Sequence, residues 1–213
     1  SQIVASYFPK HSIAVLSGPN FAEEVSRNMP AATLIASNKI ATSKKIASIV
    51  QTKLFRPYVS DDVIGSQIAG ATKNVYAIAC GVVEGKKFGK NAVASIISRS
   101  FAEVSRLNKS MRAKPETLSG LSGMGDLFLT CSSKKSRNFK LGLDLASGMS
   151  LSSIIKKNSS IAEGVFTARA LKQMSLKKKL NLPIAETVYQ ILYRKKNIDH
   201  AIEELLNRPI GRE

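Results

Sequence analysis

The sequence predicts a short α/β segment followed by an all-helical segment. Before residue 61, three short apolar runs that suit buried strands alternate with two stretches of helical spacing; beyond it the apolar residues recur at helical spacing. Alternating strands and helices are typical of a parallel sheet. Three strands make a poor domain by themselves, so we interpret them as the last βαβαβ portion of a Rossmann-like parallel sheet. We place this portion at residues 1–66 and an all-α domain at residues 67–213.

The strand predictions depend on the apolar runs and on the residues that interrupt them. Ser12–Leu16 is largely apolar and stops at Ser17-Gly18-Pro19, which favours a turn. Ala31–Ser37 and Phe55–Val59 are expected to be the second and third strands. Between the strands we expect helices at residues 21–27 and 42–52.

Helix-end signals divide the remainder of the chain. Asp61 and Asp62 would cap the helix that opens the second domain, and Asn91 is expected to cap a helix over residues 91–107. Ser136 is expected to begin a helix that Gly148 ends. Further helices are expected at residues 162–180, 183–195 and 199–207.

The formal net charge of +17 is the extreme feature of the composition. Such an excess can serve nucleic-acid binding, can attract an anionic substrate or cofactor, or can be a lysine-rich surface without a function of its own. The basic residues are spread along the whole chain and aromatic residues make up 6% of it. We therefore favour the last interpretation, place substrate attraction second, and expect no nucleic-acid partner.

Hydropathy and cysteine content indicate a cytoplasmic protein without a membrane span. No stretch reaches the roughly 18 apolar residues that a transmembrane helix needs, and no signal-peptide pattern opens the chain. Cys80 and Cys131 lie far apart in the sequence and near no histidine cluster. We therefore expect neither a disulfide framework nor a metal site.

Two segments carry groups that could act on a ligand. In residues 16–25, Gly18 and Asn20 lie between the end of a strand and the start of a helix, where α/β sheets bind ligands. An ordinary βα turn is the alternative. In residues 68–79, Lys73 is the single lysine of a helix built mainly of small and apolar residues. Its side chain either snorkels to the surface or lies partly buried, where an amine can transfer a proton.

Two later segments carry a carboxylate and a cluster that suits an anion. Two glycines precede Asp126 and would let the backbone bend to present the carboxylate, unless Asp126 is merely a turn residue. Ser136 is expected to cap a helix whose first turn holds Arg137 and Asn138. The helix dipole, the N–H groups of the first turn and the guanidinium all attract an anion. A solvated basic loop is the alternative.

In this order, the four segments resemble the bacterial NAD(P)-dependent glycerol-3-phosphate dehydrogenase family. The family's LSGPSFA, GALKNV, GLAGLGDLVLTCTSPLSRN and AEGVRTA stretches match residues 16–22, 70–75, 120–138 and 162–168. Residues 183–208 match the family's C-terminal helices. The resemblance covers nearly the whole chain, and the anion cluster argues against a related hydroxyacid or phosphogluconate dehydrogenase.

The resemblance implies an oxidoreductase that interconverts dihydroxyacetone phosphate and sn-glycerol 3-phosphate with NADH or NADPH, and so supplies glycerol 3-phosphate for phospholipid synthesis. It implies that Lys73 donates or accepts the proton at the reacting oxygen and that Asp126 orients and hydrogen-bonds the substrate. It also implies that Asn74, next to Lys73 in the chain, is a hydrogen-bonding neighbour. A homodimer is plausible. The substrate-binding residues implied are Gly18, Asn20, Lys73, Asp126, Ser136, Arg137 and Asn138. The cofactor-binding residues implied are Ala22, Arg137, Ile161 and Glu163.

The chain departs from the family pattern in two places. Asn20 replaces the usual Ser or Thr, although its amide can still donate and accept hydrogen bonds. The family's Gly-rich phosphate loop, its acidic ribose residue and an upstream lysine have no counterpart after Ser1. We therefore expect the N-terminal nucleotide-binding segment to be missing from this chain. The alternative to a working dehydrogenase is a naturally truncated, inactive remnant of one.

Overall fold

The computed structural model describes residues 1–157 and 161–209, which form two compact units. Unit 1 comprises Ser1–Lys73 and Val104–Thr130, and unit 2 comprises Asn74–Glu103 and Cys131–Glu213. Two long helices, α4 (Val63–Gly85) and α5 (Lys90–Ser110), contribute residues to both units. The units are therefore not continuous stretches of chain, and the predicted domain division at residue 66 stays a prediction.

Unit 1 is built on a three-stranded sheet in the order β1 (Val15–Ser17), β2 (Ala31–Ala36), β3 (Phe55–Ser60). β2 and β3 are parallel, as predicted. β1 is antiparallel to β2, so the prediction of a parallel sheet is wrong for this strand. The helices between the strands explain the difference. α2 (Ala22–Ser26) has 5 residues and spans about 7 Å, too little to return the chain along a strand. α3 (Ile40–Val50) has 11 residues and supports the parallel crossover.

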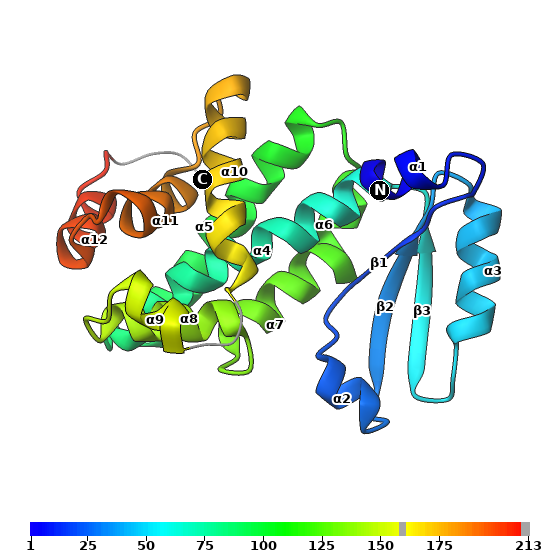
Figure 1. Cartoon of the computed structure of the whole chain (residues 1–213), viewed down its shortest axis with the longest axis horizontal. Coiled ribbons are helices and arrows are strands. Elements are labelled where there is room, and N and C mark those ends of the chain that lie inside the picture. Colours follow the sequence, from blue (N-terminus) through cyan, green and yellow to red (C-terminus); the bar gives the residue numbers. More distant parts are fainter. Residues whose placement is uncertain (158–160, 210–213) are drawn as a thin grey trace. The chain divides into compact units, whose positions relative to one another are not determined.

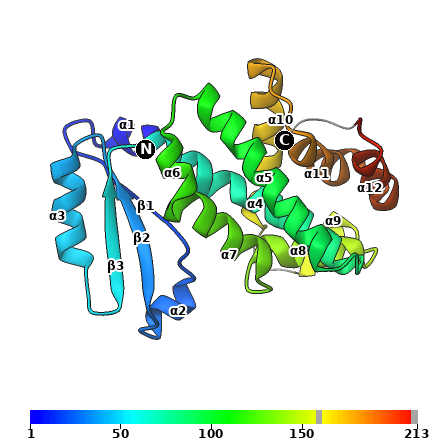
Figure 2. The same ribbon diagram turned by 180° about the vertical axis from the view of Figure 1, so that it is seen from behind.

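The sheet of unit 1 is held by a small core. Ile35 and Ala36 of β2 are at most 1% exposed. α3 lies alongside β3 in both Figure 1 and Figure 2, and its buried Ser43 hydroxyl donates to the carbonyl of Ser60 at 3.1 Å. The predicted cap at the start of α4 is confirmed, because Asp62 Oδ1 accepts the Gly65 N–H at 2.9 Å.

The segment before Asp126 is helical, whereas a bend was expected there. Residues Leu121–Gly125, which follow α6 (Pro115–Ser119), form a π-helical turn, η1, that leads into α7 (Asp126–Ser132). Unit 1 also contains a short helix near its N-terminus, α1 (Gln2–Tyr7). A Cβ added to Gly123 would lie 1.8 Å from the Leu118 carbonyl oxygen. A glycine is therefore needed here for the close approach of two backbone segments, and η1 fixes where α7 begins.

The described secondary structure of unit 2 is helical. Besides its parts of α4 and α5 it contains α8 (Arg137–Ala146), α9 (Leu151–Lys157), α10 (Glu163–Lys178), α11 (Pro183–Arg194) and α12 (Ile198–Leu206). α11 lies between α10 and α12 in both views (Figure 1, Figure 2). The predicted helices are confirmed to within a few residues, and α9 was not predicted. Asn91 is not a cap, because α5 begins at Lys90.

Close helix crossings and buried polar contacts stabilise unit 2. A Cβ on Gly142 of α8 would lie 2.2 Å from the Ile78 carbonyl oxygen of α4, so these two helices touch through backbone. Glu103 of α5 is 1% exposed and accepts the N–H of Ile184 at 2.7 Å and that of Ala185 at 3.2 Å. It also accepts the Tyr76 hydroxyl at 3.2 Å. One buried carboxylate thus caps the start of α11.

Candidate active site

Lys73 of α4 and Asp126 at the start of α7 form an ion pair in unit 1. The Lys73 Nζ lies 2.6 Å from both carboxylate oxygens of Asp126. The Asp126 side chain is 4% exposed and that of Lys73 is 21% exposed. Lys73 therefore does not snorkel to the surface. It is a partly buried ammonium group whose position a buried carboxylate sets.

The groups around Asp126 shift the pKa of its carboxyl in opposite directions. Burial raises the pKa of this carboxyl, while the Lys73 ammonium, the Thr130 hydroxyl and the Gly18 backbone N–H lower it. Thr130 Oγ1 donates to Asp126 Oδ1 at 3.3 Å. Thr130 was missed by the sequence analysis, although its i+4 spacing from Asp126 on one helix was a usable signal.

The Lys73–Asp126 pair lines an open pocket of about 540 Å³, together with residues at the end of β1 that include Gly18 and Asn20. Gly18 has a φ of +154°, and a Cβ there would lie 3.2 Å from the Cα of Thr33. The two amide atoms of Asn20 are buried and have no hydrogen-bond partner within the described ranges. Unit 1 thus places an ammonium and a carboxylate around one pocket, which Gly18 and Asn20 also line.

The start of α8 in unit 2 holds the predicted anion cluster. Ser136 is the N-cap as predicted, and its Oγ accepts the Phe139 N–H at 3.3 Å. Ser136 is 5% exposed and Asn138 is 7% exposed. The Arg137 side chain is 64% exposed, and its Nη2 lies 4.0 Å from Glu163 Oε1 at the start of α10. Of the three clustered side chains, that of Arg137 is the one presented to solvent.

The amide of Asn138 is engaged at both ends. Its Nδ2 donates to Asn74 Oδ1 at 2.9 Å, and its Oδ1 accepts the Gly164 N–H at 2.9 Å. Asn74 Nδ2 in turn donates to Glu163 Oε2 at 3.3 Å. The structure therefore brings together Asn74, Asn138 and Glu163, whose contact the sequence analysis did not foresee.

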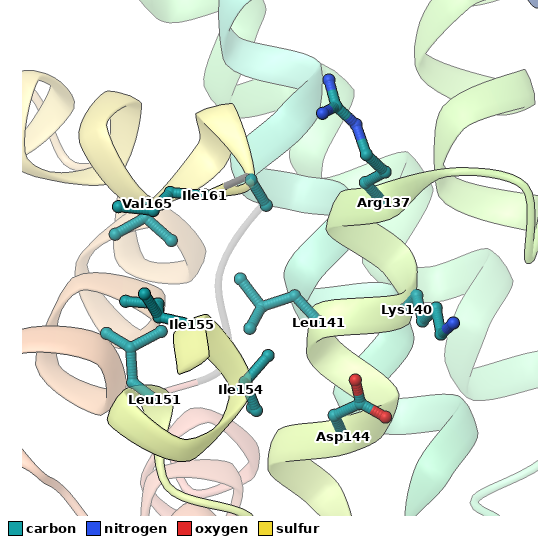
Figure 3. A pocket seen from close by; sticks show the side chains of 10 residues that line it. Arg137, Lys140, Leu141, Asp144, Leu151, Ile154, Ile155, Ile161 and Val165 are labelled. Atoms are coloured by element: carbon teal, nitrogen blue, oxygen red, sulfur yellow. The ribbon is translucent and has the colours of Figure 1, made fainter. Parts of the chain in front are cut away.

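The remaining predicted positions lie elsewhere. Ala22 is exposed at the start of α2. Ile161 lines a pocket of about 160 Å³ between α8, α9 and the start of α10. Figure 3 shows Leu141, Ile154 and Ile155 gathered in this pocket, with the Arg137 guanidinium directed away from them. The pocket is lined by apolar side chains and by the charged Arg137, Lys140 and Asp144.

Cysteines and metal ligands form no further site in the parts of the chain that the structure describes. No three His, Cys, Asp or Glu side chains there are grouped so as to hold a metal ion. Cys80 and Cys131 are both buried and are not joined in a disulfide. Across the same residues, no helix has the length and apolarity needed to cross a membrane.

Two family models match the chain. The model described as NAD-dependent glycerol-3-phosphate dehydrogenase C-terminus matches residues 62–203, and the corresponding N-terminus model matches residues 1–43. The chain belongs to the NAD-dependent glycerol-3-phosphate dehydrogenase family. The predicted family is therefore confirmed.

Relatives within the family agree with this assignment. The glycerol-3-phosphate dehydrogenase (NAD(P)+) of Caulobacter vibrioides is 46% identical over 213 residues, which are 100% of this chain and 64% of that protein. The crystal structure of glycerol-3-phosphate dehydrogenase from Coxiella burnetii matches with a TM-score of 0.93 at 36% identity, covering 97% of this chain and 64% of that one. The Saccharomyces cerevisiae enzyme matches with a TM-score of 0.83 at 28% identity, covering 94% of this chain and 62% of that one. The predicted fold class is confirmed apart from the direction of β1. The chain spans about 64% of the length of the Caulobacter relative.

Proposed function

We propose that this protein acts as an NAD(P)-dependent oxidoreductase that interconverts dihydroxyacetone phosphate and sn-glycerol 3-phosphate. The observation that carries the proposal is the Lys73–Asp126 pair, a partly buried ammonium bound at 2.6 Å to a buried carboxylate beside an open pocket. Reduction of a ketone requires a proton at the carbonyl oxygen, and a positioned ammonium supplies one. In the reverse direction, the amine accepts the proton of the alcohol.

In this proposal Lys73 is the catalytic residue and Asp126 holds its ammonium in place. The Asp126 carboxylate accepts donors from both Lys73 and Thr130, so the lysine side chain has little freedom to turn away from the pocket. Gly18 and Asn20 line the same pocket and belong to the substrate site of this proposal.

The start of α8 binds the substrate phosphate. Arg137 contributes a guanidinium that can form two parallel hydrogen bonds to a phosphate. The backbone N–H groups of the first turn, including that of Asn138, point along the helix axis and add the positive end of the helix dipole. Ser136 holds this turn in shape through its cap to Phe139.

The cofactor supplies the hydride when it is bound. Residues of this chain that suit it are Arg137, whose exposed guanidinium can meet a cofactor phosphate, and Glu163, whose carboxylate lies 4.0 Å from it and can accept hydrogen bonds. Ile161 offers an apolar wall near the start of α10. Ala22, a small exposed residue, would leave room for the nucleotide.

Three finer points belong to the same proposal. The glycerol 3-phosphate that the reaction produces would be used in phospholipid synthesis. Two buried thiols without a disulfide suit a reducing cytoplasm. A homodimer is proposed from the family resemblance alone.

The test is an assay of the gene product purified from its source cells, with the 213-residue chain measured beside it. We expect the gene product to oxidise NADH or NADPH when dihydroxyacetone phosphate is added. Dihydroxyacetone, which lacks the phosphate, should be a far poorer substrate. If the gene product shows no turnover with either cofactor, the inactive-remnant alternative is correct and the proposed activity is wrong.

A further inference from the structure

Helix α10 begins without a cap of its own. Its N-cap residue is Ala162, which has no side-chain acceptor. The Gly164 N–H in its first turn is instead accepted at 2.9 Å by Oδ1 of Asn138, a residue in the first turn of α8. One side chain therefore caps the start of a helix distant in sequence, a task usually done by the residue directly before the helix.

The other end of the Asn138 amide is bound to α4. Its Nδ2 donates at 2.9 Å to Oδ1 of Asn74. Asn138 is 7% exposed and Asn74 is 6% exposed, so water competes little for these hydrogen bonds. We call the contacts among Asn74, Asn138 and Gly164 the asparagine tie. It fastens α4, α8 and the start of α10 to one another.

The backbone at Gly164 is shaped to this tie. A Cβ at Gly164 would lie 2.7 Å from Asn138 Oδ1 and 2.7 Å from the Asn74 carbonyl oxygen. Cβ atoms essentially never come within 3.0 Å of such a neighbour, so a side chain here would push α10 away from the two asparagines. The glycine and the two amides are thus two separate observations of the same close approach.

The tie lies directly beneath two exposed, charged side chains. Arg137 precedes Asn138 and Glu163 precedes Gly164, and their charged atoms lie 4.0 Å apart. Both side chains are more than 60% exposed, and an ion pair so open to solvent contributes too little to hold its own geometry. The buried tie links the two helix starts that carry Arg137 and Glu163.

We propose that the side chain of Asn138 is a positioning residue, which holds the start of α10 against α8 and thereby fixes the first turn of α8, from which Arg137 projects, for anion binding. The backbone N–H of Asn138 belongs to the proposed phosphate site, whereas its side-chain amide forms the asparagine tie. The inference rests on the proposed function in one respect, the binding of phosphate by Arg137.

The experiment measures two quantities on the full chain: the affinity for inorganic phosphate by titration, and the hydrogen-exchange rate of the Gly164 amide. For Asn138→Ala we expect exchange at Gly164 to rise on the order of tenfold, the size of losing a helix cap, and phosphate binding to weaken. Exchange at Val188 of α11 should stay unchanged, which excludes global unfolding. For Asn138→Asp, whose carboxylate can still accept the N–H, exchange at Gly164 should stay close to that of the wild type.

Asn197→Ala is the matched control. Asn197 caps α12 of the same unit by accepting the His200 N–H at 3.1 Å. Its loss should speed exchange at His200 and leave phosphate binding unchanged. Arg137→Ala should abolish phosphate binding and leave exchange at Gly164 unchanged.

Three outcomes overturn the inference and remain distinguishable. If Asn138→Ala weakens phosphate binding while exchange at Gly164 is unchanged, the amide contacts the phosphate directly. If exchange rises and phosphate binding is unchanged, the tie is structural and does not position the site. If wild type and Arg137→Ala bind phosphate equally, or neither binds it, the phosphate site of the proposed function fails and the positioning role fails with it.

Discussion

The two units differ in how completely they bury their apolar side chains. Unit 2 encloses a run of α4, Val75–Ile78, that is at most 1% exposed. Unit 1 leaves large apolar side chains in water along its first helix and around its sheet, including Ile3, Tyr7, Leu16, Ile49 and Tyr58. The apolar area removed from water is the main source of stability. We therefore expect unit 2 to be the more stable of the two.

Buried polar groups show the same contrast. Unit 2 pairs its buried Glu103 and Asn138 with backbone N–H groups at helix starts. Among the described residues, the buried amide atoms of Asn20 and Asn108 in unit 1 have no hydrogen-bond partner, and in unit 2 the hydroxyl of Ser100 has none. Each buried polar group without a hydrogen-bond partner lowers the stability of the folded state. The unit that we expect to be less stable is thus the one that holds Lys73.

The largest expected effect is on unit 2, for Glu103→Ala. This change leaves the buried N–H groups of Ile184 and Ala185 without their acceptor. We expect a loss of about 3 kcal/mol in the free energy of unfolding, measured by urea denaturation followed by circular dichroism. Tyr76→Phe removes one neutral donor to the same carboxylate and should cost about 1 kcal/mol. Equal, small losses for both variants would show that buried caps do not stabilise unit 2.

The second effect concerns the π-helical turn of unit 1, and compares Gly123→Ala with Gly125→Ala. The added methyl at Gly123 would meet backbone at 1.8 Å, whereas at Gly125 its nearest neighbour is Pro19 Cγ at 3.5 Å. We expect Gly123→Ala to cost about 1–3 kcal/mol through overpacking and Gly125→Ala to be nearly neutral. The same denaturation experiment checks this. If the two variants are equally stable, η1 does not fix the start of α7.

A third prediction concerns the pH dependence that Asp126 gives to unit 1. Burial raises its pKa above the ordinary value of 3.8, so the folded state binds the proton more readily than the unfolded state does. The wild type should therefore lose stability relative to Asp126→Asn as the pH rises through the window from 3.8 to the raised pKa. Thermal unfolding of both proteins across that window measures the difference. A difference with the opposite slope would mean that Lys73 outweighs burial.

The smallest effect is expected for Asp61, an exposed carboxylate in the same unit. The hydrogen bond from Lys114 lowers the pKa of Asp61 below 3.8, so its contribution is present above 3.8 and is lost as the pH falls through the lowered pKa. The contribution of Asp61 to stability therefore rises with pH, whereas that of Asp126 falls as the pH rises. Because the pair is exposed, Asp61→Asn should barely change the melting temperature at neutral pH. A large change in the melting temperature at neutral pH would contradict the expectation that exposed ion pairs contribute little to stability.

The sequence predicted the features that local chemistry decides. The helix predictions agree with α8, α10 and α11 to within about two residues, since helix-end signals are visible in a short window. The Ser136 cap and the stop at Gly148, which has a φ of +90°, follow from residue type in the same way. The candidate residues around Lys73 came from the family motifs, and the structure brings four of them into one pocket.

Features that depend on distant partners were not predictable in this way. Lys73 and Asp126 are 53 positions apart, and Asn138 and Asn74 are 64 apart, so no local pattern reveals that they meet. The direction of β1 depends on the length of α2 and on the sheet it joins. The two glycines before Asp126 indicated a bend, whereas packing of Gly123 against the Leu118 backbone winds the chain into a π-helical turn.

The central claim is that the lysine of unit 1 performs proton transfer and the arginine of unit 2 binds phosphate. Its most direct test is the steady-state kinetics of Lys73→Ala and Arg137→Ala in the active gene product. We predict that Lys73→Ala lowers kcat by about a hundredfold to ten-thousandfold with NADH affinity nearly unchanged, and that Arg137→Ala mainly raises the KM for dihydroxyacetone phosphate. Near-normal turnover by Lys73→Ala would contradict the claim and remove Lys73 from the mechanism.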